Sequence, residues 1–435
     1  MRTKDTVIIG FMLFALFFGA GNLIYPPFLG IEAGTSYWAA IAGFVLTGVG
    51  IPVITVAAIS FVKNGAVELG SRVHPLFGII FTSIVYLAIG PFFGIPRAAN
   101  VAYEMGVVPF TDVSTGTLLI YSIIFFLLVF WVSLNPSKLV DRVGQFLTPA
   151  LLLAIIGLVI GSFFFLDGSL QAPTEKYESS PFFTGFLEGY LTMDAIAALA
   201  FGIIVIQALK DRGVSDPKQM TKFTLKVGAV TAIGLTTVYA SIGWIGAKMA
   251  TNGEYANGGE ILSSAASLMY GQPGTLLLGI IVALACFTTC VGLTVACGQF
   301  FHEIFPALSY RLVITVITLI SFSIANIGLN QIIAYSVPVL VFIYPIAIVL
   351  IILTFAHRLF NGSPYVYRGA ILTTAFVSIY DGLAAFGIDM TAYEPMMAQL
   401  PFFGVGLGWI VPAFVGALVG GMFHLFLQPK TVESN

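Results

Sequence analysis

The chain has 435 residues, of which 58% are hydrophobic and only 9% are charged, and its mean hydropathy is +1.00. A soluble protein carries roughly 25% charged residues, so this composition excludes a soluble globular protein and indicates a surface that faces lipid. The formal net charge is −2, and no basic cluster of the kind that binds nucleic acid is present in the sequence.

Apolar stretches of membrane-spanning length recur along the chain. A bilayer core about 30 Å thick requires roughly 20 apolar helical residues for each crossing. The sequence therefore predicts an all-α polytopic protein with about twelve spans in a single membrane domain over residues 1–435. The spans are expected near 6–29, 37–62, 76–101, 116–134, 146–166, 182–208, 226–247, 274–300, 311–327, 331–355, 369–388 and 402–427.

The positive charges predict how the chain is oriented. If the N-terminus is cytoplasmic, only Arg97, Lys176 and Lys248 fall on the outer side, and the other fifteen of the eighteen Lys and Arg residues fall inside. Such an excess follows the positive-inside rule, and it places both termini in the cytoplasm. The inner residues are Arg2, Lys4, Lys63, Arg72, Lys138, Arg142, Lys210, Arg212, Lys218, Lys222, Lys226, Arg311, Arg358, Arg368 and Lys430.

Two of the expected spans are interrupted. The first contains GAGN (Gly19–Asn22) followed by Pro26–Pro27, and the sixth contains GYLTMDAIAALAFG (Gly189–Gly202). Interruptions in the leading span of each half indicate an inverted-repeat transporter with its site between the halves. The physical reason is that freed backbone groups are tolerated in lipid only where they line a cavity or bind a ligand. The alternative is that these glycines serve flexibility or close helix packing.

The same two stretches resemble a known family. FALFFGAGNLIYPPFLG (Phe14–Gly30) and Gly189–Gly202 are similar to the signature stretches of bacterial branched-chain amino acid carrier proteins, which are cation-coupled symporters of leucine, isoleucine and valine. More distantly, GAGN resembles the GLGN of LeuT-type sodium symporters. The resemblance implies a LeuT-like 5+5 inverted repeat, with halves at 1–166 and 182–355, two peripheral helices over 369–427, and a place in the bacterial inner membrane.

The first break supplies candidate substrate ligands. Amides at the start of a half-helix favour an anion, because the helix dipole is positive there. By the resemblance, the amides of Ala20 and Gly21 bind the carboxylate of the substrate. Asn22 is expected to bond substrate or ion, or to cap the second half-helix.

The sixth span carries an intramembrane acid. A charge at this depth is costly, so Asp194 is expected to serve a partner, which is the substrate ammonium, the coupling ion or a proton. Thr192 is an alternative occupant of the substrate position, and hydrogen bonding within the broken helix is the structural alternative for Asp194. Asp381 in the eleventh span is expected to be structural, and Glu188 is expected near the outer mouth.

The eighth span offers a candidate cation site. Ala285, Thr288 and Thr289 have the spacing that brings a carbonyl and two hydroxyls together on a helix. The resemblance implies that they bind sodium together with the carbonyls of Ala15 and Phe18. The alternative is that both threonines bond only their own backbone.

The sequence thus predicts a sodium-coupled importer of branched-chain amino acids that works by alternating access, with no cofactor besides the coupling ion. Proton coupling with a small neutral amino acid stays open, although the fifth span lacks the basic residue that proton-coupled relatives often carry. A channel is a further alternative. An intramembrane aspartyl protease using Asp194 and Asp381 is disfavoured, because the sequence lacks a Gly-x-Gly-Asp motif.

Overall fold

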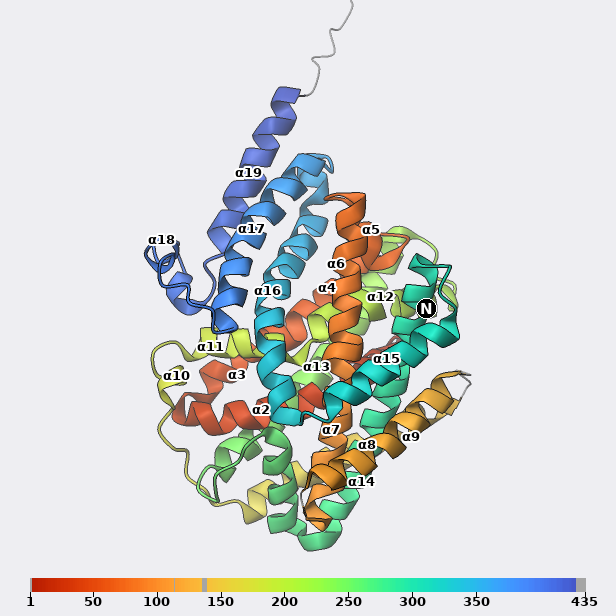
Figure 1. Cartoon of the computed structure of the whole chain (residues 1–435), viewed down its shortest axis with the longest axis vertical. Coiled ribbons are helices and arrows are strands. Elements are labelled where there is room, and N and C mark those ends of the chain that lie inside the picture. Colours follow the sequence, from red (N-terminus) through yellow and green to blue (C-terminus); the bar gives the residue numbers. More distant parts are fainter. Residues whose placement is uncertain (1, 113, 135–138, 428–435) are drawn as a thin grey trace, which may run out of the picture.

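The fold is helical throughout the part of the chain that can be described. The computed structural model describes residues 2–112, 114–134 and 139–427, and within these ranges every regular element is a helix (Figure 1). Lys138 and Lys430, two of the residues expected inside, lie outside the described residues. The prediction of an all-α protein is confirmed.

The helices of the first half cover residues 3–165. They are α1 (Thr3–Phe17), α2 (Ala20–Ala33), α3 (Tyr37–Val45), α4 (Ile51–Ile59), α5 (Gly65–Ser71), α6 (Pro75–Leu87), α7 (Gly94–Gly106), α8 (Thr115–Leu134) and α9 (Leu139–Phe165). Short 3-10 or π-helical turns join several of them, at Gly34–Ser36, Leu46–Gly50, Ala88–Phe92 and Val108–Phe110.

The helices of the second half and the C-terminal region follow from residue 175. They are α10 (Glu175–Glu178), α11 (Pro181–Glu188), α12 (Asp194–Lys210), α13 (Pro217–Met249), α14 (Gly258–Ile304), α15 (Tyr310–Ala325), α16 (Leu329–Ala356), α17 (Pro364–Ala385), α18 (Glu394–Met397) and α19 (Ile410–Leu427). Short 3-10 turns lie at Gly189–Thr192, His357–Phe360 and Phe403–Val405.

Six helical segments of the described chain are long and apolar enough to cross a membrane alone, and a seventh candidate is the pair α11 and α12, which is bent by 48°. The ranges expected to span lie largely on helix, which confirms the positions of the apolar segments, but the last range, 402–427, begins before its helix α19. The total number of crossings stays a prediction. The expected division between the ninth and tenth spans is observed. α15 ends at Ala325, and α16 begins after Gly328, which has a φ of 90°.

The third span differs from the expected uninterrupted helix. A π-helical turn at Ala88–Phe92 separates α6 from α7, and Gly90 there has the non-helical angles φ −92° and ψ −116°. Pro91 supplies the physical reason, since it lacks an N–H and clashes with a regular helix. Helix then continues to Gly106, so Arg97 lies inside this segment and is only 4% exposed. Its burial shows that it packs inside the helical bundle, and the side of the membrane on which it lies stays a prediction.

The first span is broken at one place instead of two. α1 ends at Phe17 and α2 begins at Ala20, so the break coincides with the GAGN stretch. Pro26–Pro27 was expected to break the helix as well, but it lies inside α2 without ending it. Each proline removes a single hydrogen bond, and the turns around the pair persist.

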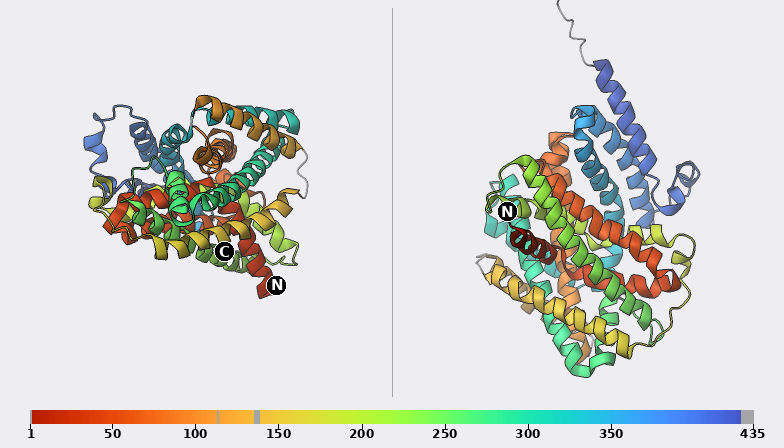
Figure 2. Two further views of the ribbon diagram at one scale, coloured as in Figure 1. Left: turned by 90° about the horizontal axis from the view of Figure 1, so that it is seen from below. Right: turned by 180° about the vertical axis from the view of Figure 1, so that it is seen from behind.

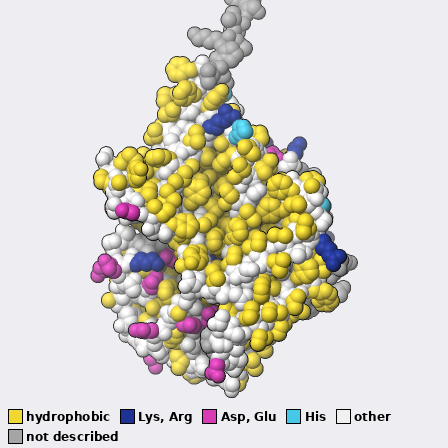
Figure 3. Space-filling view, in the orientation of Figure 1, with side chains coloured by type: hydrophobic (Ala, Val, Ile, Leu, Met, Phe, Trp, Pro, Cys, Tyr) yellow, Lys and Arg dark blue, Asp and Glu magenta, His cyan; other side chains and the backbone are white. Residues whose placement is uncertain are grey.

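The broken helices pack against several other helices. α2 packs against α13 and α14, α1 packs against α13, and α12 packs against α4. The helices α17 and α19 pack against each other at one edge, and α17 packs extensively against α16 (Figures 1 and 2). The face shown in Figure 3 is mostly apolar, with acidic side chains gathered at the lower left and basic ones mainly at the upper right. This surface suits lipid contact between two polar ends.

Candidate functional site

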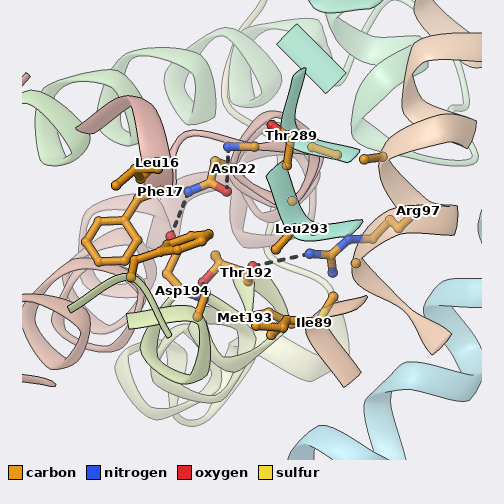
Figure 4. A pocket seen from close by; sticks show the side chains of 17 residues that line it. Leu16, Phe17, Asn22, Ile89, Arg97, Thr192, Met193, Asp194, Thr289 and Leu293 are labelled. Atoms are coloured by element: carbon orange, nitrogen blue, oxygen red, sulfur yellow. Dashed lines mark hydrogen bonds between the residues drawn. The ribbon is translucent and has the colours of Figure 1, made fainter. Parts of the chain in front are cut away.

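The breaks in the first and sixth spans face one pocket. The break in the first span lies at Phe18–Gly19, between α1 and α2. The break in the sixth span lies at Met193, a left-handed residue with φ 65° between the turn Gly189–Thr192 and α12. Residues on both sides of each break line the pocket (Figure 4). The two interruptions predicted from sequence therefore meet in space.

All five substrate-binding candidates from the sequence line this pocket. They are Ala20, Gly21, Asn22, Thr192 and Asp194. The apolar part of the wall comes from several helices, and its larger side chains are Leu16, Phe17, Ile89, Met193, Phe201 and Leu293. The pocket thus combines a polar side at the helix breaks with an apolar side.

Asp194 is fixed by donors from two other helices. It is the first residue of α12 and is 3% exposed. Its Oδ2 accepts hydrogen bonds from Asn22 Nδ2 at 2.7 Å and from the Tyr239 hydroxyl at 2.9 Å. Asn22 Nδ2 also contacts the Tyr239 hydroxyl. These side-chain partners lie on α2 and α13, so the carboxylate connects the sixth span to its neighbours.

The start of α2 carries the expected amides. Ala20 and Gly21 are the first two residues of α2, and the first N–H groups of a helix have no partner within it. The Gly19 N–H donates to Asn22 Oδ1 at 3.4 Å, so Asn22 caps this helix end and binds Asp194 at the same time. The capping role considered for Asn22 is thus observed, and its bond to substrate or ion stays a prediction.

Thr192 holds the second break together. Its hydroxyl donates to the Gly189 carbonyl at 2.9 Å and accepts from the Asp194 N–H at 3.3 Å. Its own carbonyl accepts from Arg97 Nη2 at 3.2 Å. The Thr192 side chain is therefore engaged in shaping the turn that precedes Asp194.

Arg97 is the site residue that the sequence reasoning missed. It lines the pocket from α7, and its Nη1 donates to the Leu191 carbonyl at 2.6 Å (Figure 4). An ideal Cβ on Gly21 would lie 2.7 Å from Arg97 Nη2, so the guanidinium adjoins the break in the first span as well. The signal was available, because a basic residue within an apolar stretch is a functional candidate by default.

Of the five cation candidates, Thr289 lines the pocket, and Ala15, Phe18, Ala285 and Thr288 are not among its lining residues. The hydroxyls of Thr288 and Thr289 both donate to the Ala285 carbonyl, at 2.9 Å and 3.0 Å. Thr289 lines the pocket, and its Cγ2 lies 3.7 Å from an ideal Cβ on Gly19. The predicted carbonyl and hydroxyls are thus together, and both hydroxyls make the backbone bonds that the alternative foresaw.

Ala15 and Phe18 lie at the end of α1. Ala15 is in its last turn, where carbonyl groups lack partners within the helix, and Phe18 directly follows its last residue. The C-terminal end of a helix carries partial negative charge, so this end favours a cation. Within the described residues, no hydrogen bond joins these two residues to Thr288 or Thr289.

Other candidate residues lie apart from the pocket. Asp381 is half-buried on α17 and does not line it. Glu188, at the end of α11, pairs with Lys176 at 2.6 Å, and Lys176 also pairs with Glu32 at 3.3 Å. Burial opposes the charge of Lys176, but the carboxylates of Glu188 and Glu32 outweigh it and raise the pKa of Lys176. This ion-pair cluster joins the end of α2 to α10 and α11.

The fold is similar to that of a solved transporter. Mhp1, a nucleobase-cation-symport-1 family transporter in a closed conformation with bromovinylhydantoin bound, superposes with a TM-score of 0.62 at 14% identity, over 97% of this chain and 92% of that one. An inward-facing conformation of Mhp1 gives a TM-score of 0.59 at 15% identity, over 96% of this chain and 90% of that one. The chain therefore has a LeuT-like transporter fold, as the sequence resemblance implied.

Sequence comparison gives the family. The branched-chain amino acid permease BraB of Bacillus subtilis is 47% identical, over 99% of this chain and 98% of the permease, and the branched-chain amino acid permease BrnQ of the same species is 48% identical, over 97% of each. The profile of the family described as branched-chain amino acid transport protein matches residues 2–427. The protease alternative is thereby removed. The chain belongs to the branched-chain amino acid transport protein family, whose members are membrane transporters and not enzymes.

Proposed function

We propose that this chain is a secondary active symporter that imports leucine, isoleucine and valine together with sodium by alternating access. The observation that carries the proposal is the meeting of two broken helices at one pocket with polar and apolar sides. Transporters bind substrates at such breaks because the freed backbone groups serve as ligands. The substrate class comes from the names of the permeases that it resembles.

The amino acid binds with its polar end between the two breaks. Its carboxylate accepts from the amides of Ala20 and Gly21, at the positive end of α2. Its ammonium lies near Asp194, with Asn22 and the Thr192 turn completing the polar wall. In this arrangement, the candidate residues bind the carboxylate and the ammonium, which all α-amino acids share.

The aliphatic side chain of the substrate contacts the apolar wall. Leu16, Phe17 and Phe201 contribute to that wall. Burying a leucine side chain is worth roughly 1.5–3 kcal/mol relative to water. A pocket of this kind therefore favours branched aliphatic side chains over polar ones, because a polar side chain would lose its hydration without gaining partners.

Sodium binds between the end of α1 and the eighth span. Its ligands are the carbonyls of Ala15, Phe18 and Ala285 and the hydroxyls of Thr288 and Thr289. The donor set fits, since these are neutral oxygens, and the end of α1 adds partial negative charge. Bound sodium would occupy the space beside Gly19, close to the substrate, and the two sites would be coupled through the first break.

Proton coupling is the second candidate, and one observation favours it. Asp194 is the one carboxylate among the residues that line the pocket, so it could carry a proton in place of an external cation. A sodium gradient and a pH gradient applied separately distinguish the two ions. If the pH gradient alone drives accumulation of the amino acid, the coupling ion is a proton and not sodium.

The proposed location is the bacterial inner membrane, with both termini in the cytoplasm. The support is the distribution of Lys and Arg along the sequence, which favours the cytoplasmic side for the loops that carry most of them. The halves 1–166 and 182–355 form the inverted repeat, and the helices over 369–427 lie at its periphery.

Counterflow exchange tests the substrate class. Proteoliposomes loaded with unlabelled leucine should take up labelled leucine, and external isoleucine or valine should suppress that uptake. Glutamate and lysine should not compete, because the apolar wall offers no partner for a second charge. Failure of all three branched-chain amino acids to exchange would remove the proposed function.

A further inference from the structure

Arg97 is held rigidly beside the pocket by neutral groups. It is 4% exposed, and its Nη1 donates to the Leu191 carbonyl at 2.6 Å and to the Tyr25 hydroxyl at 3.1 Å. Its Nη2 donates to the Thr192 carbonyl at 3.2 Å. The guanidinium carbon also lies 5.4 Å from the centre of the Tyr25 ring. These contacts fix the position of the charge but do not neutralise it.

No anion among the described side chains pairs with this charge. Within the described residues, Arg97 forms no ion pair, and its buried Nε has no hydrogen-bond partner. A buried charge without an opposite charge is costly, and an unmet donor adds to that cost. Such a residue is retained where a ligand supplies the missing partner.

The free donors of Arg97 match a carboxylate. A guanidinium has five N–H donors, and the three hydrogen bonds above leave the Nε hydrogen and one Nη2 hydrogen unused. Adjacent guanidinium N–H groups bind the two oxygens of a carboxylate side by side. The unused Nε and Nη2 donors, called the fork below, are therefore available to a carboxylate.

The fork lies where a substrate carboxylate is expected. An ideal Cβ on Gly21 would lie 2.7 Å from Nη2 and 3.2 Å from Cζ of Arg97, so the guanidinium adjoins the start of α2. In Figure 4, Arg97 and Asp194 enter the pocket from different sides. Two opposite charges that share a pocket without pairing are complementary to a zwitterion.

We propose that Arg97 binds the carboxylate of the transported amino acid, alongside the amides of Ala20 and Gly21. The inference rests on the proposed function and deepens it, because it makes the pocket selective for zwitterions through a fixed pair of opposite charges. The carboxylate is thus recognised by a side chain of the third span as well as by the first break.

Ligands that lack one charged group test this role. Labelled leucine exchange is measured with leucine, leucinamide (which has no carboxylate) and 4-methylpentanoate (which has no ammonium) as competitors. The wild-type protein should prefer leucine to leucinamide by about tenfold or more, as expected when a charged hydrogen-bond partner is lost. Equal competition by the two ligands in the wild type would overturn the proposal without any variant.

The variants separate binding from structural support. Arg97→Gln should reduce the preference for leucine over leucinamide about tenfold, and Arg97→Lys should reduce it less, because the charge stays and the fork is lost. Asp194→Asn should instead reduce the preference for leucine over 4-methylpentanoate. If Arg97 had a purely structural role, its substitution would weaken the binding of leucine and of leucinamide equally. The preference for leucine would then stay unchanged, which would contradict the proposal.

Arg72→Gln is the matched control. Arg72 Nη1 also donates to a tyrosine hydroxyl, that of Tyr367, at 3.1 Å, but it does not line the pocket. This variant should keep the wild-type preference. If the wild-type protein exchanges no leucine at all, the proposed function fails; if it exchanges leucine and Arg97→Gln keeps the wild-type ratio, only the role of Arg97 fails.

Discussion

At the scale of single residues, Asn22 links the two halves of the site. Its side chain accepts from the Gly19 N–H and donates to Asp194, so one amide both caps α2 and orients the acid of the sixth span. An amide can do this because it carries a donor nitrogen and an acceptor oxygen on the same carbon. The breaks in the first and sixth spans are therefore coupled by a direct hydrogen bond.

Gly21→Ala should weaken leucine binding strongly while leaving the protein folded. The added Cβ would lie 2.7 Å from Arg97 Nη2 and 3.2 Å from the Thr192 carbonyl, so it would displace the guanidinium and cover the amides of the break. We expect a loss of about tenfold or more in leucine affinity. Competition with labelled leucine measures it.

Gly157→Ala serves as the control for that variant. An ideal Cβ on Gly157 would have nothing within 4 Å, and this residue lies in α9 away from the pocket. It should bind leucine like the wild type. Near-normal leucine affinity in Gly21→Ala would contradict the proposal that the amides of Ala20 and Gly21 bind the substrate carboxylate.

Thr288→Ala and Thr289→Ala should each weaken the binding of sodium more than the binding of leucine. Each substitution removes one of about five proposed ligands, and loss of a polar partner costs roughly 1–3 kcal/mol, or about tenfold or more in apparent sodium affinity. Thr→Ser at either position keeps the oxygen and should be nearly silent. Sodium dependence of uptake at saturating leucine measures these effects, and wild-type dependence in both Ala variants would assign the threonines to helix packing.

The residues of the first break and Asp194 could be selected from the sequence, since glycines and an acid are conspicuous in apolar spans. Arg97 was not selected because it lies toward the end of the expected range 76–101, where a basic residue is also compatible with a place near the outer surface. Tyr239 could not be found either. A tyrosine in an apolar helix gives no sign of the acid that it will meet, and only the packing of α13 against the broken spans brings it there.

At the scale of elements, the pocket depends on helices that stop and resume. α1 and α2 bring a negative and a positive helix end together at Phe18–Gly19, which suits a cation on one side and an anion on the other. The sixth span is also interrupted, at Met193, whose backbone lies in the left-handed region. This conformation is uncommon for a residue other than glycine, and such residues cluster at functional sites.

Gly271→Ala should destabilise the protein. Gly271 has φ 65° and ψ −162° at the kink of α14, a conformation almost reserved for glycine. An ideal Cβ there would meet only Pro273 Cδ, at 3.8 Å, so the cost is conformational and about 1–3 kcal/mol. Thermal unfolding in detergent should show a lower melting temperature.

Gly292→Ala is the matched control in the same helix. Gly292 is exposed and helical, and an ideal Cβ there has nothing within 4 Å. Alanine is favoured over glycine in a helix by about 0.5–1 kcal/mol, so this variant should keep or raise the melting temperature. An unchanged melting temperature in Gly271→Ala would mean that the kink is not needed for stability.

Apolar length predicted where the helices lie, including the separation of α15 from α16 around Gly328. It did not predict the π-helical turn at Ala88–Phe92, because one Gly-Pro pair within an apolar run is compatible with either a continuous or an interrupted helix. The prediction that Pro26–Pro27 breaks the helix was wrong. Whether proline breaks a helix depends on the neighbours that accept the freed carbonyls, and those are set by tertiary packing.

At the scale of the whole molecule, charge and lipid contact set the orientation. A reporter fused after Lys63, or within 210–222, should read cytoplasmic, and one near Glu175 should read external. The reason is that translocating loops rich in Lys and Arg is disfavoured. An external signal at Lys63 or a cytoplasmic signal at Glu175 would contradict the proposed topology.

The central claim is that the pocket at the two helix breaks binds branched-chain amino acids and that a sodium gradient drives their uptake. The most direct measurement is labelled leucine uptake into proteoliposomes with an inward sodium gradient, with equal sodium on both sides, and with no sodium. We predict transient accumulation above equilibrium only with the gradient, and its loss when the sodium gradient is collapsed. Accumulation that ignores sodium, or no leucine uptake in any of the three conditions, would contradict the account.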